Sequence, residues 1–233
     1  MMWRESMKLI VFGATGRTGH LVVEQALAAG HEVTAVARGL SALTIQHPRL
    51  EVIRGDVLEL STFEQAITGK DAVISTLGGA MHAPTTLYSV GIANIVRAMQ
   101  AAGVRRLVSL SAGALDPGPF FQRVAARLIL WPLFGNGYAD MARMEAALSK
   151  SHLDWTVIRP PRLTNGPHTG RYHTAVKKHL SGGRAVSRAN LADYIVTHLA
   201  DPTTYRAWVE IANASHGPAP NRGPMGLDDA ANG

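Results

Sequence analysis

The amino-acid sequence predicts a doubly wound α/β fold, in which helices cover both faces of a parallel β-sheet. Short apolar runs rich in β-branched residues alternate with helical patterns along much of the chain. A glycine-rich turn joins the first of these runs to the first helical pattern. Nearly continuous apolar strands that alternate with helices are typical of parallel sheets buried on both faces.

The predicted strands are recognised by their apolar character, and the glycines and polar residues around them mark where they end. In chain order we expect strands over residues 7–14, 32–38, 50–57, 71–77, 106–111, 155–158 and 208–212. The last of them is expected at the edge of the sheet.

The predicted helices are recognised by apolar residues at helical spacing and by their end signals. In the first helix Leu21, Val22 and Ala26 share one face, and Gly30 supplies the stop. In a short second helix Ser61 and Glu64 have capping-box spacing. We expect helices over residues 17–29, 61–67, 85–102, 120–130, 138–149 and 190–199.

The length and composition favour one folded domain. A chain of 233 residues, 46% of them hydrophobic, suits a single large domain, which we place at residues 7–213. Residues 214–233 are rich in glycine and proline and keep no apolar period, so we expect a disordered tail. The absence of cysteine excludes disulfides, thiolate metal sites and a cysteine nucleophile. The histidines have no metal-ligand spacing, and no metal is expected.

The charge pattern gives little support for a nucleic-acid or membrane partner. The formal net charge is +6, but the basic residues form no stripe with interleaved aromatic residues. No apolar run is long enough for a signal peptide or a membrane span. We therefore expect a soluble, cytoplasmic protein without sequence-specific nucleic-acid binding. The sequence gives no indication of the oligomeric state.

The glycine-rich turn predicts a dinucleotide-binding site. Gly13 permits the tight turn, Gly16 lets phosphates approach the backbone, and Gly19 lets the helix pack close to the strand. The free N–H groups at the start of the helix favour anions. The residues expected to hold the diphosphate are Gly13, Thr15, Gly16, Arg17, Thr18 and Gly19.

Arg38, at the end of the second strand, favours NADP(H) over NAD(H). An acidic residue at this place would accept from the ribose 2′-hydroxyl and repel a 2′-phosphate. Arg17 could reach the same phosphate from the other side, and guanidinium groups suit that dianion. The alternative is that both arginines are solvated surface charges.

Five segments, GATGRTG (13–19), RGDV (54–57), SLS (109–111), WTVIRPP (155–161) and TGRY (169–172), give the chain a family resemblance. It resembles the atypical short-chain dehydrogenase/reductases, and within them the NAD(P)H-binding group that includes flavin reductase/biliverdin-IXβ reductase and the NmrA-type proteins. The similarity runs from about residue 7 to 213. It implies a Rossmann fold and further cofactor contacts at Asp56, Val57, Thr76, Leu77, Gly78, Ser109, Pro160 and Pro161. It also implies that Ser111 stands beside the nicotinamide.

One departure concerns the proton-transfer pair of the classical and extended branches, Tyr-x-x-x-Lys. Tyr138 is followed at this spacing by Ala142, and neither Tyr172 nor Tyr205 has a lysine there. Alcohol dehydrogenation by that mechanism is therefore not expected. The flavin and biliverdin reductases, which the chain resembles, lack the pair as well.

The chemistry that remains is hydride transfer to a small conjugated acceptor such as a flavin or a quinone, which can take its proton from water. Ser111 could bind the nicotinamide or the acceptor, or its hydroxyl could only satisfy backbone groups at a strand end. His168 could donate a proton, or be a surface residue. For Arg159 a structural role is preferred over binding of an acidic substrate.

Two further points stay open. Trp131, Phe134 and Tyr138 are expected in a loop, as core or interface residues more readily than as a substrate platform. The alternatives to a reductase are a non-catalytic NADP(H)-binding redox sensor of the NmrA type and an epimerase with bound NADP.

Overall fold

The computed structural model describes residues 6–40, 43–79, 81–115, 131–180 and 183–214. Its strands are β1 (Lys8–Phe12), β2 (Glu32–Ala37), β3 (Leu50–Arg54), β4 (Ala72–Ser75), β5 (Arg106–Leu110), β6 (Asp154–Arg159), β7 (Arg162–Thr164), β8 (Tyr172–Val176), β9 (Ala185–Ser187) and β10 (Ala207–Asn213). Its α-helices are α1 (Arg17–Ala28), α2 (Leu87–Ala102), α4 (Trp131–Lys150) and α5 (Arg188–Thr197). Short 3₁₀ helices are η2 (Leu60–Thr62), η3 (Glu64–Ile67), η4 (Gly113–Leu115) and η6 (Pro202–Thr204).

Within these residues one sheet of eight strands forms the centre of the molecule, in the order β3-β2-β1-β4-β5-β6-β10-β8. Neighbouring strands run parallel, except that β8 is antiparallel to β10. β7 and β9 pair separately, in parallel. The strand order reverses between β1 and β4, the place where open α/β sheets bind ligands at the carboxyl ends of their strands.

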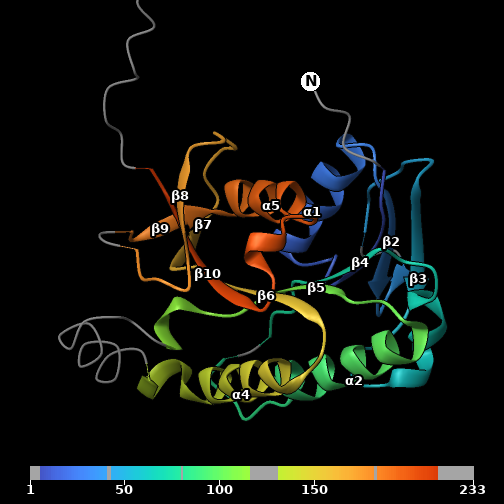
Figure 1. Ribbon diagram of the computed structural model, residues 1–233, viewed down its shortest axis with the longest axis horizontal. Coiled ribbons are helices and arrows are strands. Elements are labelled where there is room, and N and C mark those ends of the chain that lie inside the picture. The colour runs from blue at the N-terminus through green and yellow to red at the C-terminus, as the bar shows by residue number, and fades with distance from the viewer. Residues whose placement is uncertain (1–5, 41–42, 80, 116–130, 181–182, 215–233) are drawn as a thin grey trace, which may run out of the picture.

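Helices cover both faces of the sheet, with α1 and α5 on one face and α2 and α4 on the other (Figure 1). Strand β1 shows how the sequence produces this arrangement. Leu9 and Val11 are buried in the core under α1 and α5, whereas Ile10 and Phe12 are buried in the core under α2 and α4. Because successive side chains of a strand point to opposite faces, a continuous apolar run supplies two cores. The predicted doubly wound α/β fold is confirmed.

The last predicted strand was misplaced, because β10 is an interior strand rather than an edge strand. β10 lies between β6 and β8, and β8 forms the edge. Strands β7, β8 and β9 were not predicted at all. Residues 172–176 read Tyr-His-Thr-Ala-Val and are only partly buried, so the sequence carries too little apolar pattern to reveal an edge strand.

Two predicted helices differ in the structure. Residues 61–67 form parts of the 3₁₀ helices η2 and η3, and no side chain caps either one. So short a segment gains too few helical hydrogen bonds to offset nucleation, and it is held instead by burial of Phe63 and Ile67. The helix predicted at 138–149 begins at Trp131, so the expected loop around Phe134 and Tyr138 is helical.

Two other predictions lie outside the described residues. They are the helix at residues 120–130 and, apart from Ala214, the disordered tail at 214–233. Arg159 has the structural role preferred for it. Its guanidinium pairs with Glu145 and lies over the ring of Trp208, 4.7 Å from the ring centre.

Candidate functional site

A cavity of about 900 Å³ opens at the carboxyl ends of the central strands, where the order reverses. Among the residues named from the sequence, thirteen line it: Gly13, Thr15, Gly16, Arg17, Thr18, Arg38, Asp56, Val57, Thr76, Leu77, Gly78, Ser111 and Pro160. These residues come from the ends of β1, β2, β3, β4, β5 and β6, which the parallel sheet brings to one edge.

The glycine turn after β1 has the geometry of a diphosphate cradle. Gly13 has φ +76°, and a Cβ there would lie 2.7 Å from the carbonyl oxygen of Thr76. The N–H of Gly16 donates to the carbonyl oxygen of Gly13 over 3.0 Å, which closes the turn. A Cβ at Gly19 would lie 2.1 Å from the same oxygen, so only glycine lets α1 approach this closely. Thr76 ties the turn to β4 because its hydroxyl donates to the carbonyl oxygen of Phe12 over 3.0 Å.

The N-terminus of α1 points its positive end into this cradle. Gly16 is the N-cap and offers no side chain to the first N–H groups, and the first turn carries no acidic residue. The first N–H groups of a helix have no partner within the helix, and together with the helix dipole they favour an anion. The residues present therefore fit the diphosphate of a dinucleotide.

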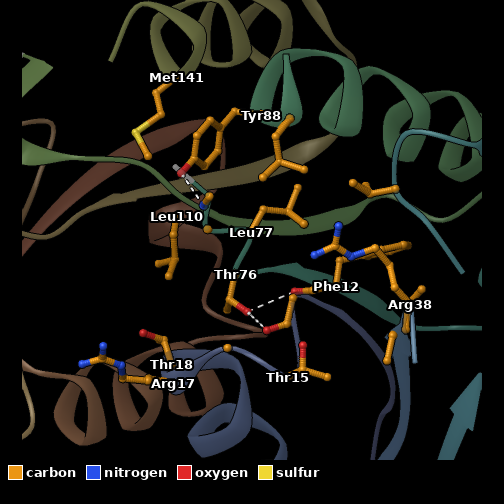
Figure 2. Close-up of a pocket in the computed structure, with 18 of the residues that line it drawn as sticks. Phe12, Thr15, Arg17, Thr18, Arg38, Thr76, Leu77, Tyr88, Leu110 and Met141 are labelled. Atoms are coloured by element: carbon orange, nitrogen blue, oxygen red, sulfur yellow. Dashed lines mark hydrogen bonds between the residues drawn. The ribbon is translucent and has the colours of Figure 1, made fainter. Parts of the chain in front are cut away.

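Arg38 stands directly after β2, on the side of the cavity where Asp56 and Val57 follow β3. A carboxylate oxygen of Asp56 accepts from the N–H of Leu58 over 2.9 Å, which orders the turn after β3. Figure 2 shows Arg17 and Arg38 on opposite sides of the glycine turn. Both arginines line the same cavity, and whether their guanidinium groups reach one phosphate from its two sides stays a prediction. Two separate elements, β2 and α1, carry these residues in different directions.

Ser111 is the most informative polar residue in the cavity. It follows β5 and is only 6% exposed. Its N–H donates to the carbonyl oxygen of Ile158 over 2.8 Å, which anchors it beside the end of β6 and Pro160. Among the described residues, its Oγ is the single buried side-chain polar atom without a hydrogen-bond partner. Buried hydroxyl groups are normally paired with protein or with ordered water, so this one is a candidate partner for a group bound in the cavity.

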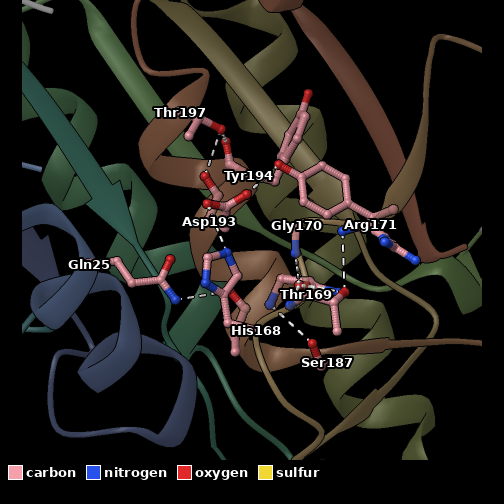
Figure 3. Close-up of polar contacts among 12 residues, drawn as sticks. Gln25, His168, Thr169, Gly170, Arg171, Ser187, Asp193, Tyr194 and Thr197 are labelled. Carbon is pink, nitrogen blue, oxygen red and sulfur yellow. Dashed lines mark hydrogen bonds and ion pairs between the residues drawn. The ribbon is translucent and has the colours of Figure 1, made fainter. Parts of the chain in front are cut away.

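Four predicted site residues do not line the cavity. Gly19 acts through helix packing, and Ser109 is buried against the sulfur of Met144, 3.6 Å away. Pro161 lies one residue beyond the cavity wall. His168 is about half exposed, and its Nε2 lies 3.1 Å from a carboxylate oxygen of Asp193, in the polar group drawn in Figure 3.

Several residues of the cavity were missed by sequence reasoning. Leu110, Tyr88, Met141 and Leu163 add an apolar wall, and Arg188 adds a cation. They come from β5, α2, α4, β7 and α5, which meet here only through the tertiary structure. For Met141, Leu163 and Arg188 the loose pattern after residue 111 held no signal.

The cavity offers little acid–base chemistry of its own. Its described ionisable residues are Arg17, Arg38, Asp56, Tyr88 and Arg188, with no lysine, histidine or glutamate among them. The Tyr88 hydroxyl accepts from the N–H of Gly79 over 3.2 Å, and burial raises the pKa of Tyr88 above its usual value. Tyr88 is therefore a neutral hydrogen-bonding group at pH 7. No cluster of metal-ligating side chains occurs in the part of the chain that the structure describes.

The same part of the chain contains no helix long and apolar enough to cross a membrane. A cytoplasmic location is a separate matter and stays a prediction.

Comparisons with known proteins identify a cofactor-binding family. A family described as NAD(P)H-binding matches residues 13–202. An uncharacterised chloroplastic protein of Arabidopsis thaliana is 28% identical over 223 residues, which cover 92% of this chain and 79% of the relative. YwnB, an uncharacterised protein of Bacillus subtilis, is 28% identical over 83% of this chain and 91% of its own.

A solved structure shares the fold. It is a short-chain dehydrogenase/reductase of Veillonella parvula in complex with NADP, with a TM-score of 0.73 and 21% identity over 90% of this chain and 95% of that one. The predicted resemblance to the atypical short-chain dehydrogenase/reductases is confirmed, and the chain belongs to the NAD(P)H-binding family.

Proposed function

We propose that the protein is an NADPH-dependent reductase of a small conjugated acceptor, such as a flavin or a quinone. The observation that carries this proposal is the buried, unpartnered Oγ of Ser111 in the wall of the cavity. A hydroxyl held rigidly at a strand end is suited to orient a nicotinamide or the acceptor beside it, and His168, outside the cavity, is the weaker candidate for a catalytic role.

The surroundings of Ser111 fit a flat apolar acceptor. Leu110, Tyr88 and Met141 gather on one side of the cavity, away from Arg38 (Figure 2). Apolar walls exclude water from the reacting ring, and the few polar groups fix its orientation. A bound dihydronicotinamide would supply the hydride. The described wall contains no lysine or histidine to move a proton, which favours an acceptor that becomes protonated from water.

The reductase proposal is tested with purified protein, NADPH and either FMN or a quinone, followed at the nicotinamide absorbance. We expect NADPH oxidation that is lost in Gly16→Asp, where a carboxylate occupies the phosphate cradle. Ser111→Ala should bind NADP⁺ but turn over at least about tenfold more slowly, since it loses a hydrogen bond to the reacting groups. Tight cofactor binding without oxidation, across a panel of acceptors, would instead favour the non-catalytic sensor.

The preference for NADP(H) rests on Arg38. Its guanidinium is solvent-exposed at the mouth of the cavity and forms no ion pair with any described carboxylate, so it is available to a 2′-phosphate. We expect NADP⁺ to bind more tightly than NAD⁺ and Arg38→Asp to reverse the order in calorimetry. Arg54→Asp is the matched charge reversal, because Arg54 is exposed on β3 and outside the cavity. Equal affinities for the two cofactors in the wild type would defeat the assignment.

A further inference from the structure

Two arginines converge on the cavity from the starts of two neighbouring helices. Arg17 is the first residue of α1 and Arg188 the first residue of α5, and both line the cavity. Helices α1 and α5 pack against each other on one face of the sheet (Figure 1). The fold therefore brings two positive charges together on the α5 side of the cavity.

The described part of the chain supplies no negative charge to this pair. Neither arginine forms an ion pair with a described carboxylate, and neither helix has an acidic residue in its first turn. Arg188 is held by an amide instead, since its Nη1 donates to Oδ1 of Asn165 over 2.7 Å. Asn165 follows β7, and Arg188 follows β9, which pairs with β7. A neutral partner orients the guanidinium and leaves its charge available.

The placement is unfavourable for the protein without a ligand. The N-terminal end of a helix carries partial positive charge, so a cation there is repelled. Partial burial and the charge of Arg17 lower the pKa of Arg188. An anion that binds between the two guanidinium groups would pair with both and offset their mutual repulsion.

Arg38, the residue proposed for the 2′-phosphate, stands on the other side of the glycine turn from Arg17 (Figure 2). The diphosphate already has the amides of the glycine turn. Arg188 contacts Asn165, two residues after Leu163 of the cavity wall, and Pro160 and Ser111 line the same cavity. Building on the proposed reductase function, we propose that Arg17 and Arg188 bind a phosphate or carboxylate of the acceptor, so that the enzyme selects anionic acceptors.

Binding of two flavins that differ by one phosphate tests this assignment without requiring turnover. The dissociation constants of FMN and riboflavin are measured by flavin fluorescence on protein saturated with NADP⁺. We expect FMN to bind at least about tenfold more tightly than riboflavin, because its phosphate gains a charge-assisted hydrogen bond from the arginines. Arg188→Gln should bring the ratio close to one and leave the affinity for NADP⁺ unchanged. Arg184→Gln is the matched control, because Arg184 is exposed nearby and outside the cavity.

The outcomes separate this inference from the reductase proposal. Equal binding of the two flavins, or binding of neither, overturns the anion subsite. Weaker NADP⁺ binding in Arg188→Gln with an unchanged flavin ratio assigns the pair to the cofactor and overturns it as well. Preferential FMN binding without NADPH oxidation would support the subsite while contradicting the reductase.

Discussion

Gly19→Ala is a sharp test of the glycine cradle, because one added methyl group meets backbone atoms. The new Cβ would lie 2.1 Å from the carbonyl oxygen of Gly13 and 2.6 Å from Oγ1 of Thr76. Ordinary contacts begin near 3.4 Å, so α1 must move away from β1 by about 1 Å. Gly19 is buried, and the carbonyl of Gly13 cannot turn away without opening the tight turn.

The free energy lost when α1 moves is partly offset by the higher helix propensity of alanine. Overpacking costs about 1–3 kcal/mol, and alanine in a helix recovers roughly 0.5–1 kcal/mol relative to glycine. The net cost is therefore up to roughly 2.5 kcal/mol, which lowers the melting temperature of a domain of this size by up to about 10 °C. Because the amides of α1 move with the helix, the affinity for NADP⁺ should fall by more than about tenfold.

The assay is thermal unfolding followed by circular dichroism, together with calorimetric titration of NADP⁺. Gly39→Ala is the control, since a Cβ at Gly39 meets nothing within 4 Å and its backbone is not left-handed. The control should match the wild type in both measurements. Wild-type stability and affinity in Gly19→Ala would refute the argument that close helix packing shapes the cradle.

Three further variants probe polar side chains and their hydrogen bonds. Without ligand, Ser111→Ala should melt at the wild-type temperature or about 2–4 °C higher, because the hydroxyl that it removes has no partner. A lower melting temperature in thermal unfolding would contradict the unpaired Oγ. In Arg106→Met the free energy of unfolding, measured in urea, should fall by about 2–4 kcal/mol, because the buried guanidinium donates to backbone carbonyls that would be left unpaired. Arg105→Met is the control at an exposed position and should unfold at the wild-type urea midpoint. Hydrogen bonds from Thr203 lower the pKa of Asp201 in the folded protein. The ionised Asp201 carboxylate therefore stabilises the fold above pH 3.8, its ordinary pKa, and this effect is lost as the pH falls through the lower pKa of the folded state. Asp201→Asn should therefore unfold more easily than the wild type at pH 6 and like it near pH 2, and a pH-independent difference in melting temperature would contradict this.

The sequence alone determined the fold class and the phosphate-binding turn. Both depend on local patterns: continuous apolar strands predict a sheet covered on both faces, and glycine at 13, 16 and 19 marks the turn of one strand–turn–helix unit. The positions of Arg38 and Ser111 followed as well, since each is the last residue of a predicted strand, and strand ends of a parallel sheet meet at one edge.

The tertiary structure alone decided the second half of the cavity and the edge of the sheet. Strand β8 pairs with β10 through residues more than thirty positions away, so its weak apolar pattern carries no trace of its partner. Whether Arg17 faces Arg38 or Arg188 depends on how α1 sits against α5, a contact between segments about 170 residues apart. Local residue preferences act over a few positions, whereas the packing of distant elements sets which charges share one cavity.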